Sequence, residues 1–326
     1  MKTMIPDRLK TAKSVMITGH TGPDGDCVGS CLGLYHFIRE NYPQIRVDVR
    51  LEEVPKVYRA IPGADQILTQ AEDDVTYDLV ITSDASARDR FETFARYFDS
   101  ASYRICIDHH ISNTGFADEN YIVPGASSAS EIVADIIVGI AGEAAISYNI
   151  AYALYVGMIC DSGVFKYSCT GRRTMEIAGM LMEKGIPYTA MIDDFFYRKT
   201  FRQNLVLARC LQLCRLEAGG RLILCRLDQQ EQQALEASHD DLEGIVAQMR
   251  LTEGVEAAIF SYEKEDGSWK FSLRSDHIID VSRIASAYGG GGHMRAAGFS
   301  LTSDAACAEQ ALVREMEAQL AACTME

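Results

Sequence analysis

Short apolar runs alternate with amphipathic stretches throughout the first half of this 326-residue chain. The apolar runs at 14–19, 46–51, 78–82 and 103–107 are typical of buried strands, and 27–41 has the periodicity of a helix. Alternation of strands and helices of this kind predicts an α/β domain with a parallel sheet and helices on both faces.

Polar residues follow three of these predicted strands at the point where each strand ends. His20 follows the first, Asp84 follows the third, and Asp108, His109 and His110 follow the fourth. In open α/β sheets, ligands bind at the carboxyl ends of the strands. We therefore expect these side chains to converge on one site.

The second half of the chain has a different pattern. Residues 129–185 are helical in period, with Asp161 in a turn, and 192–213 reads as one long amphipathic helix. Beyond it, strands at 222–227, 255–261, 269–273 and 296–301 mix with helices at 281–288 and 305–321, which predicts a smaller mixed α+β domain. The expected organisation is a first domain at 1–190, a connector helix at 191–215 and a second domain at 216–326.

Composition limits the possible partners and location. A net charge of −15 disfavours binding to long duplex nucleic acid, which needs a basic surface. The ten cysteines lack the spacing of a disulfide framework, and no apolar stretch is long enough to span a membrane. We expect a cytoplasmic protein with free thiols and no membrane contact.

Carboxylates and histidines form the chemical pattern of the first domain. The segment GHTGPDGD supplies His20, Asp24 and Asp26, and we expect its tight loop to point both carboxylates into one cavity. Mixed Asp/His ligands favour a borderline divalent ion such as Mn²⁺. So many ligands suit a pair of ions roughly 3.5–4 Å apart, with Asp84 placed to bridge them.

Each of these residues also has a purely structural interpretation. PDGD alone is a common turn, and Asp84 or Asp161 alone could cap a helix. Burying so many carboxylates together without cations would cost several kcal/mol per ion. Their joint placement at neighbouring strand ends therefore favours a metal centre.

At this point the sequence resembles the DHH phosphoesterase superfamily. The segment GHTGPDGD, Asp84, the Asp-His-His triplet and the CDSG turn around Asp161 are similar to its four successive motifs. FSLRS at 271–275 and GGGGH at 289–293 resemble the DHH-associated C-terminal domain.

The resemblance implies a role for each matching residue. His20, Asp24 and Asp84 would hold one Mn²⁺, and Asp26, Asp84, His109 and Asp161 would hold a second. Asp84 and His110 would be catalytic, with His110 on the scissile phosphate or its leaving oxygen, and Asp108 would orient the site.

In the second domain, Arg274, Ser275, Gly290, Gly291, Gly292 and His293 are the candidate substrate-binding residues. A guanidinium group suits phosphate, and glycine N–H groups allow close approach of an anion. A flexible glycine turn and a surface arginine are the structural alternatives. Ser127, Ser128 and Ser130 are interpreted as helix-capping residues, with substrate contact as the second choice, and Cys27, Cys106 and Cys160 as buried packing residues.

Within the superfamily, the compact two-domain form is similar to bifunctional oligoribonuclease/pAp phosphatases, or nanoRNases. This similarity implies two-metal hydrolysis of short oligonucleotides and 3′-phosphoadenosine 5′-phosphate (pAp), and a homodimer. A soluble cyclic-di-AMP or pApA phosphodiesterase is the alternative. A non-catalytic nucleotide sensor is a third hypothesis, but every expected metal ligand is present.

Overall fold

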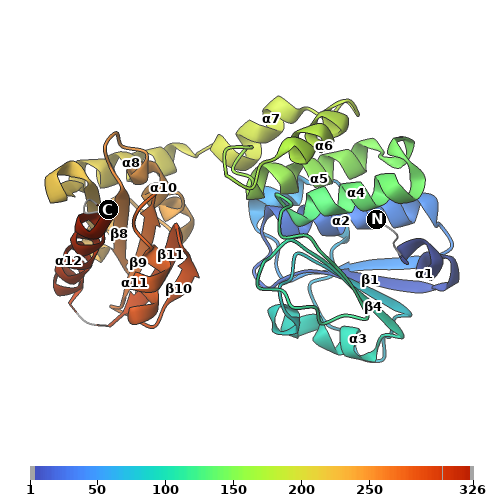
Figure 1. The fold of residues 1–326 in the computed structure, drawn as a ribbon. Coiled ribbons are helices and arrows are strands. Elements are labelled where there is room, and N and C mark those ends of the chain that lie inside the picture. Colours follow the sequence, from blue (N-terminus) through green and yellow to red (C-terminus); the bar gives the residue numbers. More distant parts are fainter. Residues whose placement is uncertain (1–3, 303, 324–326) are drawn as a thin grey trace. The chain divides into compact units, whose positions relative to one another are not determined.

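The computed structural model describes residues 4–302 and 304–323, and the chain divides into two compact units, Met1–Arg198 and Lys199–Glu326 (Figure 1). Each unit has its own sheet and its own hydrophobic core. Among the helices within those described ranges, none has the length and apolar character needed to cross a bilayer.

The first unit is built on a five-stranded, fully parallel sheet in the order β2-β1-β3-β4-β5. Its strands are β1 (Ser14–Thr18), β2 (Arg46–Arg50), β3 (Leu79–Ser83), β4 (Tyr103–Asp108) and β5 (Glu119–Ile122). The parallel sheet predicted from the alternating pattern is confirmed. β5 was not predicted, because its four residues, ENYI, are mostly polar or partly exposed.

Helices cover both faces of this sheet, as predicted (Figure 1). Val15 and Ile17 of β1 point into the larger core, whereas Met16 between them points into an aromatic core on the other face. The larger core is formed with α1 (Ile5–Thr11), α2 (Gly25–Asn41), α4 (Ala129–Ala141), α5 (Tyr148–Asp161) and α6 (Arg172–Met182). The aromatic core is formed with the 3₁₀ segment η3 (Arg88–Phe94) and α3 (Ala95–Ser100).

The predicted helix over 192–213 is not continuous, and this expectation was wrong. The chain forms α7 (Tyr188–Ile192) and the π-helical turn η5 (Asp193–Tyr197), and it is extended at Arg198. A new helix, α8 (Phe201–Leu213), then begins after Thr200, whose side chain forms a capping box with Gln203. Because this capping box starts a helix of its own, the amphipathic pattern on either side belongs to two separate elements.

The second unit contains a six-stranded mixed sheet in the order β10-β11-β9-β8-β7-β6. One face packs against α11 and α12, and the other packs against α8 and α10. The mixed α+β architecture is therefore confirmed. The strands and helices are β6 (Arg215–Glu217), β7 (Leu222–Leu227), α9 (Gln229–Ala234), α10 (Ile245–Arg250), β8 (Ala257–Glu263), β9 (Trp269–Ser275), α11 (Val281–Ala287), β10 (Gly291–His293), β11 (Ala296–Leu301) and α12 (Ala305–Cys323).

Three short elements of the second unit, β6, α9 and α10, were not predicted. A flexible turn was the structural alternative for the glycine run, but the end of this run is part of the sheet, because Gly291–His293 pair with β11 in antiparallel register. The remaining short 3₁₀ segments are η1 (Lys56–Ala60), η2 (Ala64–Gln66), η4 (Glu143–Ala145), η6 (Ala218–Gly220) and η7 (His239–Leu242).

Candidate metal centre

The loop after β1 brings His20 against two carboxylates. His20 Nε2 lies 3.6 Å from Asp24 Oδ1 and 3.4 Å from Asp84 Oδ2. Its Nδ1 is 3.0 Å from the carbonyl oxygen of Thr21, which fixes the ring with Nε2 toward the carboxylates. Burial would lower the pKa of His20, but contacts with Asp24 and Asp84 raise it to about 12. Two carboxylates therefore face one ring nitrogen of His20.

Asp84, directly after β3, lies at the centre of the site in an unusual backbone conformation. Its φ of 58° is in the left-handed region, and the residue is only 3% exposed. Asp84 Oδ1 makes no hydrogen bond to the described residues, and the imidazole nitrogens His109 Nε2 and His110 Nδ1 lie 3.5 and 3.6 Å away. Burial would raise the pKa of Asp84, but His109 and His20 hold it well below its usual range. A buried, charged oxygen without a hydrogen bond suits a cation.

Asp26 lies in the first turn of α2 and not in the loop where the sequence placed it. Helix α2 begins earlier than predicted, because Asp24 caps it by accepting hydrogen bonds from the backbone of Asp26 and Cys27. The carboxylate of Asp26 accepts from the backbone nitrogens of Ala129 and Ser130, at 2.6 and 2.9 Å. The N-terminus of α4 therefore holds this side chain, a contribution that the sequence analysis missed.

Charge repulsion accompanies this arrangement of Asp26. Burial, together with the negative charges of Asp84 and Asp161, raises the pKa of Asp26.

Ser128 caps α4 by accepting a hydrogen bond from the backbone nitrogen of Glu131, so the predicted capping role is confirmed for this serine.

His109 and Asp161 complete the same side of the site. His109 Nε2 lies 3.2 Å from Asp161 Oδ2, and Asp161 is the last residue of α5. Burial lowers the pKa of His109, but Asp84 and the charges of Asp26 and Asp161 raise it to about 10. Burial raises the pKa of Asp161 to about 6 although His109 opposes this shift.

Asp108 and His110 form a hydrogen-bonded pair beside these residues. His110 Nδ1 lies 2.8 Å from Asp108 Oδ1, and Asp108 is fully buried. This hydrogen bond raises the pKa of His110. Asn113 donates to the second oxygen of Asp108 at 2.7 Å, and the sequence analysis assigned no role to Asn113. Its position a few residues after the Asp-His-His triplet was the only available signal.

Together, the structure brings all the predicted metal ligands of the first unit into overlapping clusters, each with ligand atoms within 4.8 Å of one another. Asp84 and His109 each belong to two clusters. Carboxylate oxygens and imidazole nitrogens fit a divalent cation. The clusters are Asp84–His109–His110, His20–Asp24–Asp84 and Asp26–His109–Asp161.

The nearby cysteines do not add ligands to these clusters. Burial raises the pKa of Cys106 to about 11 and that of Cys160 to about 12, which keeps both thiols protonated. Cys27 and Cys106 are fully buried, as expected of packing residues.

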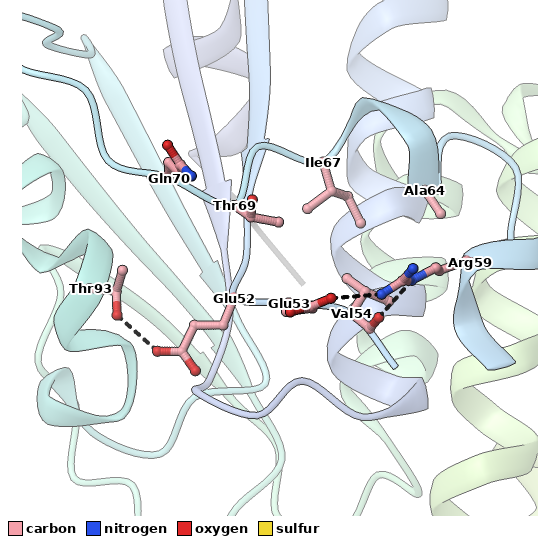
Figure 2. A pocket seen from close by; sticks show the side chains of 9 residues that line it. All are labelled: Glu52, Glu53, Val54, Arg59, Ala64, Ile67, Thr69, Gln70 and Thr93. Carbon is pink, nitrogen blue, oxygen red and sulfur yellow. Dashed lines mark hydrogen bonds and ion pairs between the residues drawn. The ribbon is translucent and has the colours of Figure 1, made fainter. Parts of the chain in front are cut away.

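Glu52, beyond the end of β2, supports the loop that carries His20 and Asp24. Its carboxylate accepts from the backbone nitrogen of Gly22 at 3.2 Å. It also accepts from Thr93 Oγ1 at 2.8 Å, a bond that Figure 2 shows. Glu52 also lines a cavity of about 500 Å³, and the predicted ligands do not line it. Glu52 therefore joins the loop that carries His20 and Asp24 to the 3₁₀ segment η3.

In the second unit, the sheet register aligns Arg274 and His293. Both residues are paired with Ala296 of β11, His293 from β10 and Arg274 from β9. Residues paired in this way project from the same face of a sheet, so the two side chains flank one position. Ser275 differs from them: it is buried, and its hydroxyl donates to the carbonyl of Ile279 at 2.6 Å.

Close packing explains two of the glycines beside His293. A Cβ at Gly290 would lie 2.2 Å from the carbonyl oxygen of Gly298, and a Cβ at Gly292 would lie 2.4 Å from that of Ala296. A Cβ at Gly291 would have no atom within 4 Å. Gly290 and Gly292 are thus required by the fold, whereas Gly291 is not.

The fold and the clusters define an α/β protein with a carboxylate–histidine centre at the carboxyl ends of its strands, followed by a separate mixed-sheet unit. Comparison with protein families agrees with this description. The DHH family, N-terminal domain, matches residues 14–158, and the DHHA1 domain matches residues 222–322. The chain therefore contains a DHH-type N-terminal domain followed by a DHHA1 domain.

Relatives resemble the chain over nearly its whole length. A Streptococcus mutans protein named "Probable bifunctional oligoribonuclease and PAP phosphatase NrnA" is 28% identical over 89% of this chain and 90% of its own. A Thermus thermophilus protein named bifunctional oligoribonuclease and PAP phosphatase NrnA is 26% identical over 91% of this chain and 87% of its own. The crystal structure of an exopolyphosphatase-related protein from Bacteroides fragilis superposes with a TM-score of 0.87 at 26% identity, covering 96% of this chain and 94% of that one.

Proposed function

We propose that this protein is a divalent-metal-dependent phosphoesterase that hydrolyses short oligonucleotides and pAp. The observation that carries the proposal is the overlap of three carboxylate–histidine clusters, two of which share Asp84 and two of which share His109. The names of the full-length relatives support the choice of substrates.

Two Mn²⁺ ions are the proposed cofactors. His20, Asp24 and Asp84 would hold one ion, and Asp26, Asp84, His109 and Asp161 would hold the other. When bound, such ions lower the pKa of water and offset charge on the phosphoryl oxygens.

The chain's own residues supply positioning. Asp108 orients His110 through Nδ1, which leaves His110 Nε2 to contact the scissile phosphate or its leaving oxygen. Arg274, His293 and the N–H groups of the glycine run are proposed to bind a substrate phosphate. The buried hydroxyl of Ser275 already donates to Ile279, so we give Ser275 a structural role in this proposal.

A substrate panel tests the proposal. Purified protein with Mn²⁺ is incubated with pAp, an RNA of about five nucleotides, pApA and pyrophosphate, and released phosphate and mononucleotides are measured. Hydrolysis of pAp and short RNA, lost in EDTA, is the expected result. Turnover of pApA alone would favour the dinucleotide phosphodiesterase, and turnover of pyrophosphate alone would refute both. Nucleotide binding without turnover would favour a sensor.

We also propose a cytoplasmic location and a homodimer. The ten cysteines form no disulfide in the described residues, which suits a reducing compartment. Size-exclusion chromatography with light scattering tests the oligomeric state.

A further inference from the structure

Asn113 connects the ends of two strands that carry the candidate site. It lies in the segment between β4 and β5 and is only 7% exposed. Its side-chain nitrogen Nδ2 donates to Asp108 Oδ2 at 2.7 Å and to the carbonyl oxygen of Ala85 at 3.2 Å. Asp108 ends β4, and Ala85 follows the left-handed residue Asp84 after β3. One amide group therefore contacts both strand ends.

The chemistry of its neighbours fixes the orientation of this amide. Asn113 Oδ1 accepts a hydrogen bond from the backbone nitrogen of Gly115 at 2.9 Å. A carboxylate and a carbonyl can only accept, so the group that faces Asp108 and Ala85 must be the NH₂. The backbone nitrogen of Asn113 donates to the carbonyl of His110 at 3.1 Å, which closes a tight turn.

A chain of hydrogen bonds leads from Asn113 to His110. Asp108 uses Oδ2 for Asn113 and Oδ1 for His110 Nδ1, and it has no solvent exposure. Because a carboxylate only accepts, His110 carries its proton on Nδ1 and turns Nε2 away from Asp108. The direction of the imidazole therefore depends on where the carboxylate of Asp108 is held.

We propose that Asn113 is a positioning residue for hydrolysis, which acts by holding Asp108 and, through it, His110. This inference rests on the proposed function, in which His110 contacts the phosphate or its leaving oxygen. A purely local role, closing the turn after β4, is the competing explanation, and the two differ in whether the effect of Asn113 passes through His110.

The test uses two substitutions and one matched control. N113L keeps the branched shape and the number of heavy atoms of the side chain and removes every hydrogen bond of the amide. N113D keeps the oxygen that accepts from Gly115 and replaces only the NH₂ group, which donates to Asp108 and Ala85, by a second oxygen. N113D is the variant to measure if N113L does not fold. N120L is the control, because the side chain of Asn120 also bonds to backbone groups of this segment, at Phe116 and Ala117, but makes no hydrogen bond to Asp108.

Kinetics at saturating Mn²⁺ separate the two explanations. We expect N113L to lower kcat by about 10-fold to 100-fold, with KM within about threefold, and N120L to leave kcat unchanged. In an H110A background, N113L should lower kcat by less than about twofold further, because the effect passes through His110. If N113L lowered kcat by the same factor in the wild-type and the H110A backgrounds, the proposal would be overturned. The same would hold if N113L and N120L lowered kcat equally.

A second readout does not depend on turnover. In ¹⁵N-histidine NMR spectra of the metal-free protein, the Nδ1 signal of His110 is assigned by its loss in H110A. We expect this signal to shift in N113L and N113D but not in N120L, and an unchanged signal in both Asn113 variants would overturn the proposal. If wild-type protein hydrolyses no phosphoester while the signal shifts, the proposed function fails and the positioning of His110 by Asn113 stands.

Discussion

Asp26 Oδ2 lies 2.6 Å from the backbone nitrogen of Ala129, a residue 103 positions further along the chain. This contact joins the first turn of α2 to the first turn of α4. The N-terminal N–H groups of a helix favour a negative charge, so α4 stabilises a carboxylate that Asp84 and Asp161 repel. The position of Asp26 is thus set by a helix and not by the flexibility of a loop.

Replacement of Asp26 by Asn tests its assignment as a ligand. Without metal we expect the free energy of unfolding to change little, because two effects of the substitution oppose each other. The amide loses one of the hydrogen bonds that Asp26 accepts, but it is no longer repelled by Asp84 and Asp161. At a Mn²⁺ concentration of 100 times the wild-type Kd, bound metal should raise the free energy of unfolding of the wild-type protein by about 2.7 kcal/mol. For a variant with a 100-fold higher Kd, the same concentration should raise it by about 0.4 kcal/mol. Urea unfolding with EDTA or Mn²⁺ measures this difference. D135N removes a partly exposed carboxylate of α4 that pairs with Arg173 and lies outside the clusters, so it should respond like wild type. Full stabilisation of D26N would exclude Asp26 as a ligand.

Two substitutions of Asp84 separate its charge from its backbone conformation. Asn tolerates a left-handed φ, whereas Ala does so at a cost of about 1–2 kcal/mol. Both D84N and D84A should lose Mn²⁺ binding and hydrolysis, and D84A should be the less stable by about that amount in urea with EDTA. Full Mn²⁺-dependent hydrolysis by either folded variant would disprove the bridging role of Asp84.

Gly157 of α5 has no side chain, and Asp26 and Ser130 occupy the space that a Cβ at this position would fill. A Cβ at this position would lie 2.0 Å from Ser130 Oγ and 2.7 Å from Asp26 Oδ1. We expect G157A to destabilise the fold by about 1–3 kcal/mol and to weaken Mn²⁺ binding measured by calorimetry. G139A is the control: Gly139 of α4 has open space at Cβ, so this change should stabilise the helix by about 0.5–1 kcal/mol. Equal stability of the two variants would contradict the packing argument.

Gly291 offers a test of anion binding that spares the fold. A methyl group meets no atom there, so G291A should unfold at the same temperature as wild type. If a substrate phosphate approaches the backbone closely, the added Cβ should raise KM by about fivefold or more, with little effect on kcat. Unchanged KM values for pAp and short RNA would remove the glycine run from the substrate site.

The sequence was a good guide wherever one local pattern determined the structure. The apolar runs of β1, β3 and β4 identified buried strands, and the parallel sheet then placed His20, Asp84 and His109 at one edge. A parallel sheet has its carboxyl ends along a single edge, so the clustering followed from topology.

Features that depend on distant parts of the chain were not predictable in the same way. The contact of Asp26 with Ala129 and Ser130 requires the first turns of α2 and α4 to lie together, and the contact of Asn113 with Ala85 requires neighbouring strands. The break before α8 was recognisable in principle, from Thr200 and Gln203, but the amphipathic period on both sides concealed it. Short polar strands such as β5 lack a local signal altogether.

The candidate ligands lie on separate segments, from the loop after β1 to the last residue of α5. A backbone cleavage between His20 and Asp161 would therefore divide the ligand set, and bound ions would hold the two pieces together. Resistance of this unit to proteolysis should consequently depend on divalent-metal supply. Limited digestion with and without Mn²⁺ would then measure how much of the protein has bound the ion.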